Sequence, residues 1–309
     1  MLVAPDASHI GKRLSIRCSD DAGFRDYLGV MKSLSTIEKR DGSILTFDPS
    51  RIVAWRIVES PTSRAGFGAP TSMRIREIES VLTTTWPPLE VEMRSGWRYR
   101  AGAGYTYRAN SILPQGTPGY GDPLLSLDEE LNFAIDFYRT RNITPTFHIP
   151  LPSYQELDEY LDAHGWEIHL EAFAMVANRM EIDARRDCEF VLTDLPTDEF
   201  QETRGVLEGA AMMSAYPAKY LVLRNPEGLA FATGRISVDG DWAAITNLFV
   251  KPEFRKQGWS KSVLAGLIES VEAPKIVLQV ESSNFVALSL YESLGFHNHH
   301  TYRFRKLRS

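Results

Sequence analysis

The sequence predicts a mixed α/β protein in which a small β-barrel precedes two α/β lobes. Three observations support this fold class. Residues 1–60 contain only short strand-like segments separated by turn residues. The rest of the chain twice shows the order strand, helix, strand, helix, ending first at Gly165-Trp166 and then at Gly295-Phe296. A stretch rich in Ser, Gly and Pro over residues 60–71 has the composition of a linker. We therefore predict domains over residues 1–66, 67–182 and 183–309.

The first segment is predicted to be all β. Residues Ile10 to Cys18 alternate apolar and polar side chains, as a half-buried strand does. Further short strands are expected over residues 27–34, 43–47 and 52–58. Several short antiparallel strands in one small domain are typical of a barrel similar to the SH3-like fold. Such a barrel can bind peptides, pack in place against its own chain or form a dimer contact, and the last alternative would make the protein a homodimer.

The middle segment alternates helices and strands. Apolar residues from Ile75 to Leu82 recur at helical spacing and stop before Pro87-Pro88. Strands are expected over residues 89–93, 97–101 and 105–113. They are followed by a helix over 127–138, an extended segment over 146–150 and a helix over 154–163, which Gly165 ends.

The C-terminal segment carries the most informative pattern. An apolar strand over residues 245–250 is closed by Lys251-Pro252 and leads into a turn over 255–260. The turn opens a helix with an apolar stripe from Val263 to Val271, and a second strand follows over 275–280. A glycine turn that feeds a helix presents free backbone N–H groups and the positive end of the helix dipole. Such a turn suits a phosphate group.

This segment resembles the GNAT acetyltransferases, whose phosphate turn reads [Arg/Gln]-x-x-Gly-x-[Gly/Ala] and whose later helix ends in Tyr-x-x-x-Gly-Phe. Here the turn runs from Arg255 to Ser260, with Ser in the place of Gly or Ala, and Tyr291 precedes Gly295-Phe296. With its barrel and two lobes, the whole chain resembles the actinobacterial-type tandem GNAT proteins. The resemblance implies an N-acetyltransferase that moves an acetyl group from acetyl-CoA to a primary amine, of a small molecule or a protein, by direct attack in a ternary complex. The alternative is a non-catalytic acyl-CoA-binding sensor or scaffold.

The resemblance assigns the CoA-binding residues. Arg255, Gln257, Gly258, Trp259 and Ser260 would form the pyrophosphate seat, because Gly258 allows close backbone approach and the amides around it would donate. The preceding strand is expected to carry a bulge. Its backbone would bind the pantetheine arm and polarise the thioester carbonyl; the residues concerned are Leu248, Phe249 and Val250.

Two residues are expected to move protons. Tyr291 would protonate the departing thiolate, a role that the resemblance implies and that a phenol with a pKa near 10 can perform; packing on the apolar stripe of its helix is the alternative. Glu281, just past the second strand, is the expected base for the amine, and Glu208 is a second candidate. Asn284 is expected to cap the last helix and, by resemblance, to contact the CoA arm.

The middle segment is predicted to be a degenerate GNAT-like lobe. In the register set by the two glycines, Leu161 stands where the C-terminal segment has Tyr291, and Tyr154 stands where it has Asn284. No Arg-x-x-Gly turn precedes the helix at Leu127. We therefore expect one CoA site, in the C-terminal lobe.

Composition excludes several other classes. The chain is 43% hydrophobic and 24% charged, as ordinary globular proteins are, and its net charge of −6 offers no basic face for nucleic acid. Cys18 and Cys188 are too few for a disulfide framework. No secretory signal or apolar run of about 18 residues is present, so no membrane contact is expected and a cytoplasmic location fits.

Two further clusters have alternative interpretations. Residues 97–100 and 105–110 are predicted to form a hairpin rich in Arg and aromatic side chains, which either holds an anionic or aromatic substrate group or packs between the lobes. In the run from His297 to His300, the side chains of His299 and His300 are expected on opposite faces of a strand, without an acidic or Cys partner at metal-ligand spacing. No metal is expected.

Overall fold

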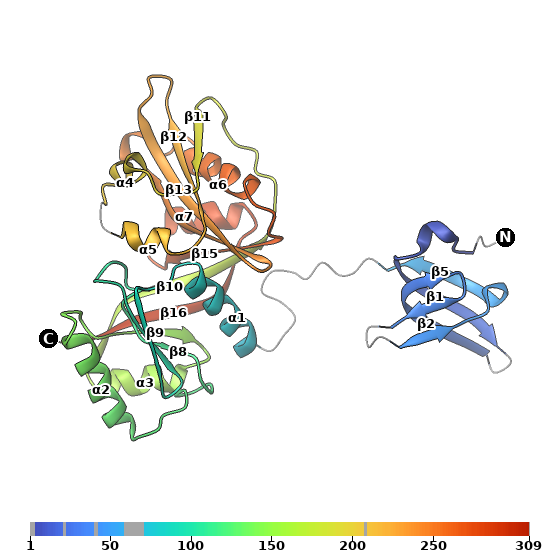
Figure 1. Ribbon diagram of the computed structural model, residues 1–309, viewed down its shortest axis with the longest axis horizontal. Helices are drawn as coiled ribbons and strands as arrows, with labels where there is room; N and C mark the ends of the chain where they lie inside the picture. The colour runs from blue at the N-terminus through green and yellow to red at the C-terminus, as the bar shows by residue number, and fades with distance from the viewer. Residues whose placement is uncertain (1–3, 21–22, 40–42, 59–70, 207–208, 309) are drawn as a thin grey trace. The chain divides into compact units, whose positions relative to one another are not determined.

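The computed structural model describes residues 4–20, 23–39, 43–58, 71–206 and 209–308. The chain divides into two compact units, Met1–Ser63 and Arg64–Ser309 (Figure 1). Among the described residues, no helix is both long and apolar enough to cross a membrane. Cys18 and Cys188 are both free thiols.

The N-terminal unit is a single antiparallel sheet. Its strands are β1 (Arg13–Asp20), β2 (Gly23–Ser33), β3 (Thr36–Glu38), β4 (Ile44–Thr46) and β5 (Ile52–Ile57), with short 3-10 helices at Ala7–His9 and Pro49–Arg51. The strand order is β4-β3-β2-β1-β5, so β4 and β5 lie at opposite edges. As described, the sheet is open, and the predicted closure into an SH3-like barrel is not confirmed.

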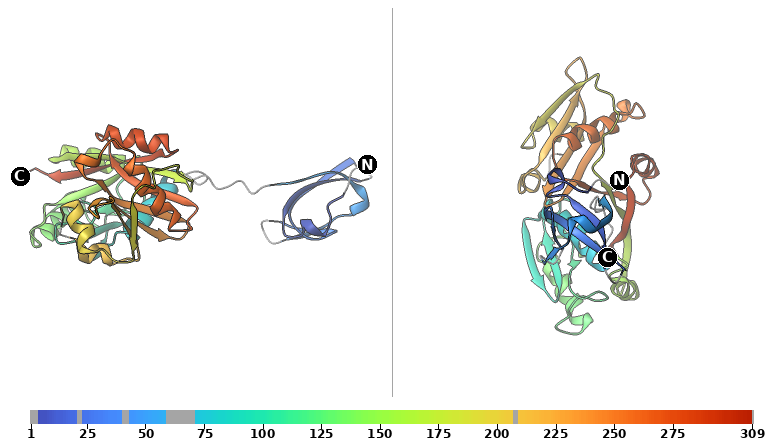
Figure 2. Two further views of the ribbon diagram at one scale, coloured as in Figure 1. Left: turned by 90° about the horizontal axis from the view of Figure 1, so that it is seen from above. Right: turned by 90° about the vertical axis from the view of Figure 1, so that its right-hand side faces the viewer.

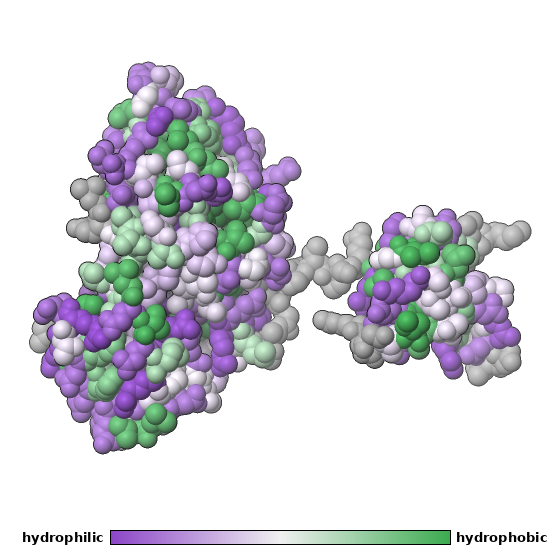
Figure 3. Space-filling model, viewed as in Figure 1, coloured by the Kyte–Doolittle hydropathy of each residue, from purple (hydrophilic) through white to green (hydrophobic). Residues whose placement is uncertain are grey.

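One face of this sheet holds a small core, and the unit also exposes apolar side chains. The buried cluster consists of Leu14, Ile16, Cys18, Met31, Ile37 and Phe47. On the outside, Phe24 and Ile44 are 71% and 62% exposed. Apolar patches are visible on the surface of this unit in Figure 3.

The second unit is built on an eight-stranded sheet with the order β11-β12-β13-β14-β15-β10-β16-β9 and a separate three-stranded sheet, β6-β7-β8. The segment up to residue 182 supplies α1 (Thr71–Thr84), β6 (Glu90–Arg94), β7 (Trp97–Ala101), β8 (Leu113–Pro114), α2 (Leu127–Arg139), β9 (Thr146–Leu151), α3 (Gln155–Ala163) and β10 (Trp166–Asn178). The remainder supplies β11 (Glu189–Thr193), α4 (Asp198–Arg204), α5 (Ala210–Ser214), β12 (Lys219–Arg224), β13 (Ala230–Asp239), β14 (Trp242–Val250), α6 (Trp259–Glu269), β15 (Lys275–Glu281), α7 (Phe285–Ser293) and β16 (His297–Leu307).

The element order recurs in the two halves of this unit. The series β6-β7-β8-α2-β9-α3-β10 corresponds to β12-β13-β14-α6-β15-α7-β16. A parallel bridge between Ile112 and Phe147 joins β8 to β9, and β14 pairs in parallel with β15. The repeated order that the sequence predicts is therefore present.

The last strands of the two halves are exchanged. β10, the last strand of the middle segment, pairs with β15 of the C-terminal segment, while β16 pairs with β9 of the middle segment. β10 and β16 also pair with each other, which makes one continuous sheet. In Figure 1 and in both turned views of Figure 2, the red C-terminal strand runs into the green part of the chain. The predicted boundary at residues 182 and 183 therefore divides the chain but not the sheet.

The two faces of the central strands are covered by different helices. α6 and the buried Tyr291 of α7 pack on the face that carries Leu278 and Val280. α1 packs through Ile78, Val81 and Leu82 on the face that carries Val277. Because side chains alternate along a strand, Gln279 and Glu281 lie on the same face as Val277, the face that α1 covers.

The predicted strand over 105–113 is wrong, because most of this segment forms a compact loop. Asn110 organises the loop: its carboxamide oxygen accepts hydrogen bonds from the amides of Gly102 and Gly104, and its NH₂ group donates to the carbonyls of Tyr105 and Thr106. Only Leu113–Pro114 remains a strand, β8, and it pairs with β7. The side chain thus satisfies backbone groups that a longer ladder would otherwise have used.

Candidate active site

The site begins where two parallel strands separate. β14 and β15 pair from Trp242 with Lys275 to Ile245 with Leu278, and no further pairs follow although both strands continue. The register between β13 and β14 shifts at the same level, between Thr233 and Arg235. Asn247 there has a φ of +58°, so β14 carries a bulge just before the predicted residues Leu248, Phe249 and Val250. The bulge turns backbone groups away from the ladder and toward the gap.

The turn after β14 ends in the first residues of α6. A 3-10 helix spans Pro252–Phe254, and Gly258 is the N-cap of α6 with a φ of +88°. No side chain caps the helix, and its first turn contains no acidic residue. A Cβ added at Gly258 would meet only the Arg185 Cδ atom, at 3.9 Å. The helix N-terminus therefore presents its amides to open space, as a phosphate seat requires.

The other predicted residues of this turn shape it. Arg255 donates from Nε to the Val250 carbonyl at 3.0 Å, which closes the turn onto the strand. Gln257 is exposed and donates to the Glu253 carbonyl, whereas Trp259 is buried and Ser260 is half-buried. A further residue, Arg185, lies beside this turn and is not singled out by any sequence pattern. Its guanidinium stacks 4.0 Å from the centre of the Trp259 ring and donates to the Gln257 carbonyl and to the Asp187 carboxylate, so a paired arginine lies beside the helix N-terminus.

The corresponding helix of the middle segment, α2, has the opposite chemistry. Ser126 and Glu129 form a capping box there, in which the side chain of each residue accepts a hydrogen bond from the backbone amide of the other. Its first turn also holds the carboxylates of Asp128, Glu129 and Glu130. The capping side chains occupy amides at the α2 N-terminus, and the carboxylates repel an anion. α2 therefore offers no seat for an anion comparable to that of α6.

Tyr291 lies in the core of the C-terminal lobe. It is 7% exposed, and its ring centre is 5.8 Å from that of Phe296. Burial raises the pKa of Tyr291 to about 12, so the phenol is protonated at neutral pH. Tyr291 therefore packs in the apolar core, as the alternative to a catalytic role predicts. This position also keeps the phenol protonated, which the catalytic role would require.

Asn284 and Glu281 flank the connection from β15 to α7. The Asn284 side chain accepts from the Ala287 amide at 3.2 Å, so the expected capping of the last helix is present. Glu281 is exposed at the end of β15 and lines a cleft. Glu208, the second candidate base, lies outside the described residues.

This cleft lies where β14 and β15 part, on the α1 side of the sheet, and has a volume of about 410 Å³. The C-terminal segment contributes residues 245–247 and 279–281, and the loop of the middle segment contributes Thr106, Tyr107 and Arg108. Leu170 of β10 and Tyr302 and Phe304 of β16 complete the wall, together with Trp86. Both halves of the unit and both exchanged strands therefore build the cleft.

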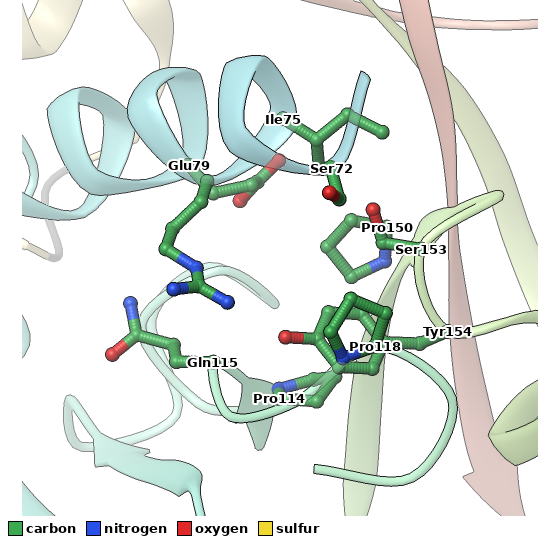
Figure 4. A pocket seen from close by; sticks show the side chains of 10 residues that line it. Ser72, Ile75, Glu79, Pro114, Gln115, Pro118, Pro150, Ser153 and Tyr154 are labelled. Atoms are coloured by element: carbon green, nitrogen blue, oxygen red, sulfur yellow. The ribbon is translucent and has the colours of Figure 1, made fainter. Parts of the chain in front are cut away.

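A second cavity beneath α1 is too small for a substrate. Its volume is about 10 Å³, which is roughly the space of a single water molecule. Ser72, Ile75 and Glu79 of α1 face Pro114, Pro118, Pro150, Ser153 and Tyr154 across it (Figure 4). The cleft that Glu281 lines, of about 410 Å³, is the candidate site for a substrate.

Glu79 belongs to a buried polar network that joins α1 to β9 and β16. His300 Nε2 lies 3.0 Å from Glu79 Oε1, and His148 Nε2 lies 3.6 Å from Glu79 Oε2. Burial opposes ionisation of Glu79, but the neighbouring imidazole and guanidinium groups and the hydrogen bond with His300 outweigh it and lower its pKa to about 2. Burial lowers the pKa of His148, so this imidazole is neutral at neutral pH. At neutral pH the hydrogen bond with His300 therefore holds the Glu79 carboxylate in the interior.

The prediction that His299 and His300 face opposite sides of a strand is wrong. Their Nδ1 atoms are 2.9 Å apart, because the register of β16 with β10 shifts between Ala174 and Met175 and leaves His299 in a bulge. Within the described part of the chain, no group of three or more His, Cys, Asp or Glu side chains is arranged to hold a metal ion.

Comparison with known families decides what this architecture is. A family model described as "Probable histone acetyltransferase Rv0428c C-terminal" matches residues 71–305, which is most of the chain. The chain belongs to this family. It is an acyltransferase of the GNAT N-acetyltransferase type, as the turn and the Tyr-x-x-x-Gly-Phe motif predict.

Relatives of this GNAT protein extend over nearly the same span. "Uncharacterized N-acetyltransferase YobR" of Bacillus subtilis (strain 168) is 29% identical over 255 residues, which cover 75% of this chain and 99% of YobR. The structure of a GCN5-related N-acetyltransferase from Kribbella flavida superposes with a TM-score of 0.61 at 12% identity, covering 76% of this chain and 96% of that one. A tandem GNAT protein from the clavulanic acid biosynthesis pathway has a TM-score of 0.50 at 14% identity, with 80% and 90% covered. These structural likenesses show the fold.

The residues that sequence reasoning missed are those that tertiary structure brings to the cleft. The sequence pattern places Gln279 within the predicted strand over 275–280 and indicates no role for Tyr302 or Phe304. Two signals were nevertheless visible: a single polar residue interrupts the apolar run of β15, and Arg108 belongs to the noted Arg-aromatic segment. Neither signal says which cleft the side chain would enter.

Proposed function

We propose that this GNAT protein transfers an acetyl group from acetyl-CoA to a primary amine, at one site in the C-terminal lobe. The observation that carries the proposal is the parting of β14 and β15. The gap lies between an uncapped helix N-terminus, that of α6, and the cleft lined by Glu281. A thioester threaded through the gap would meet an amine held in the cleft.

The residues present fit the CoA group. The amides of Gln257, Gly258, Trp259 and Ser260 would hold the pyrophosphate at the α6 N-terminus, and Arg185 and Arg255 would supply positive charge beside it. Leu248, Phe249 and Val250 would hold the pantetheine arm through their backbone, and Asn284 lies at the start of the facing helix. Bound there, acetyl-CoA supplies the reactive acetyl thioester. The capped, acidic N-terminus of α2 supports a single site rather than two.

The backbone at the bulge and the side chains of Glu281 and Tyr291 would each perform one part of the reaction. A backbone N–H at the bulge stabilises the negative charge that develops on the thioester oxygen, worth about 3 kcal/mol for one well-placed donor. Glu281 accepts a proton from the substrate ammonium, directly or through water, and passes it to solvent. The amine nitrogen bonds to the acetyl carbon and gives up its second proton to solvent through Glu281, and the carbon–sulfur bond breaks with its electron pair going to sulfur.

Tyr291 gives its phenolic proton to that sulfur and is reprotonated from solvent. Overall, an ammonium ion and acetyl-CoA yield an amide, free CoA thiol and one proton. The pKa of about 12 keeps the phenol protonated before the reaction. The same apolar surroundings that raise this pKa also disfavour a bare thiolate, so proton transfer to sulfur is favoured when the carbon–sulfur bond breaks.

The test is release of CoA thiol from acetyl-CoA by the full chain across a panel of amines, with acetylated product identified by mass spectrometry. We expect thiol release that depends on the amine and matches the acetylated product in amount. Tight binding of acetyl-CoA with no amine-dependent thiol release would contradict the proposal and would favour a sensor or scaffold.

A further inference from the structure

The cleft that Glu281 lines, here called the acceptor cleft, contains a cation with unused hydrogen-bonding capacity. The Nη1 atom of Arg108 is buried and has no hydrogen-bond partner. The charged and ionisable groups that act on Arg108 most strongly are the Tyr302 phenol and the Glu79 carboxylate; Oε1 of Glu79 has a hydrogen bond with His300, and its Oε2, like Nη1 of Arg108, has none. Burying such a donor without a partner is unfavourable, so a ligand that accepts from it gains the full benefit.

Two neighbouring buried arginines differ from Arg108 in this respect. Arg100 donates to the carbonyl and hydroxyl of Ser111 at 3.0 and 2.8 Å. Arg235 donates to the Tyr220 hydroxyl at 3.2 Å and to the Thr85 carbonyl at 3.0 Å. Both are fully buried, bonded to the protein and absent from the cleft wall, whereas Arg108 lines the cleft.

Gln279 adds a second unsatisfied group to the same wall. Both its amide nitrogen and its amide oxygen are buried without a hydrogen-bond partner. Gln279 lies two positions before Glu281 on β15, so the two side chains project from the same face into the cleft. A neutral donor next to an arginine can complete the binding of an anionic oxygen without adding charge.

Glu281 places a negative charge within reach of the same groups. The Tyr302 phenol responds electrostatically to both the Arg108 cation and the Glu281 carboxylate, and all three line the cleft. In the sheet, Tyr302 and Glu281 are both register partners of Ala172, whose small side chain leaves room between them. The cleft therefore has a site for a cationic group at Glu281 and a site for an anionic group at Arg108. The two sites are neighbours, and aromatic rings lie beside them.

On this basis we propose that the acceptor is a small primary amine that also bears a carboxylate, of the amino-acid type. The inference rests on the acetyl transfer proposed above and names its substrate class. Arg108, with the Gln279 amide, would bind the carboxylate, and Glu281 would face the ammonium group. Trp86, Tyr107 and Phe304 would cover the apolar part of the substrate. A volume of about 410 Å³ suits a whole small molecule of this kind.

The test compares amines that differ only in the carboxylate: phenylalanine against 2-phenylethylamine, and leucine against isoamylamine. For the wild-type full chain we expect kcat/KM to be at least about tenfold higher for each amino acid than for its decarboxylated amine, since a hydrogen bond to a charged group contributes about that factor or more. In Arg108→Met this preference should fall about 10- to 100-fold, with little change for the decarboxylated amines.

Two further variants keep the result interpretable. Gln279→Glu preserves side-chain size but pairs internally with Arg108, so it should lose the preference in the same direction. Arg139→Met, at the exposed end of α2, is the matched control and should behave as wild type. Affinity for acetyl-CoA, measured by titration calorimetry, should be unchanged in all three variants, because Arg108, Gln279 and Arg139 lie away from the α6 N-terminus.

Binding of the amines to the protein–CoA complex separates this inference from the proposed reaction. Calorimetry should show phenylalanine binding to wild type and not to Arg108→Met, whether or not thiol is released. If wild type binds or acetylates 2-phenylethylamine as well as phenylalanine, or if Arg108→Met retains the preference, the substrate class is wrong even though amine acetylation would stand.

Discussion

Substitution of Gly258 provides a sharp test of the CoA seat, because two isosteric residues can be compared there. Gly258 has a φ of +88° at the N-cap of α6, and a Cβ at this position meets nothing closer than the Arg185 Cδ at 3.9 Å. Asn and Asp tolerate left-handed backbone better than other residues, although the conformation costs most residues about 1–2 kcal/mol. Gly258→Asn and Gly258→Asp should therefore both fold, with similar thermal midpoints.

The two variants differ by one negative charge at the mouth of the proposed phosphate seat. Two unit charges 4 Å apart interact by about 4 kcal/mol at an effective dielectric constant of about 20. Because Gly258 is exposed, solvent and salt reduce this to roughly 1–3 kcal/mol, which corresponds to about 5- to 150-fold in affinity. We expect Asn to weaken binding moderately, through its bulk, and Asp to weaken it by that further factor.

Titration calorimetry with acetyl-CoA at low and high salt measures this difference. The gap in affinity between the Asp and Asn variants should narrow as salt rises, because the repulsion is between exposed charges. Equal affinities of the two variants for acetyl-CoA at low salt would show that no phosphate lies near residue 258, and the assignment of the α6 N-terminus would be wrong.

Three other substitutions test the remaining assignments. Tyr291→Phe should lower kcat by at most 10²- to 10⁴-fold with little change in the KM for acetyl-CoA. In the wild type, ionisation of Tyr291 should cause no loss of kcat at any pH below its pKa of about 12. Full turnover by a stable Tyr291→Phe protein would show that Tyr291 serves only in packing. Glu281→Gln should slow acetylation most at neutral pH and least near pH 10, where the amine is deprotonated without help, and a loss independent of pH would contradict its role as base. Because the pKa of Glu79 is lowered to about 2 in the fold, its carboxylate stabilises the fold above its ordinary pKa of 4.5, and this stability is lost as pH falls toward 2. Urea unfolding of Glu79→Gln should therefore show a flatter pH dependence over that range, and the same slope as wild type would show that the carboxylate does not stabilise the fold.

Local signals account for what the sequence predicted well. Apolar periodicity, a capping residue or a glycine within a few residues is enough to predict four elements: the strand before the turn, α6, β15 and the helix that precedes Gly295. Asn284 illustrates this, since the residue type favours a cap and its side chain forms one. A phosphate seat is made by consecutive amides at one helix end, so a local stretch of sequence is enough to predict where one would lie.

The loop that carries Arg108 shows why periodicity fails elsewhere. Residues 105–113 alternate well enough to suggest a strand, but a single side chain, Asn110, satisfies four backbone groups of the loop and replaces the ladder. Thr106, with a φ of +61°, has a backbone conformation that a strand cannot contain. Hydrogen bonding by one residue thus outweighed the pattern of its neighbours, and the same loop places Arg108 in the wall of the cleft.

The exchange of β10 and β16 could not be read from the sequence, because either strand could complete either half. Both are long and both carry an apolar face, so periodicity is satisfied whichever partner each one takes. The consequence for function is considerable. Tyr302 and Phe304, at the C-terminus of the chain, pair with β9 and β10 and lie in the cleft beside Glu281 and Arg108. In the site proposed above, the lobe without a phosphate seat supplies the loop and the strand on which one wall of the cleft is built, while the C-terminal lobe supplies the proposed seat for CoA.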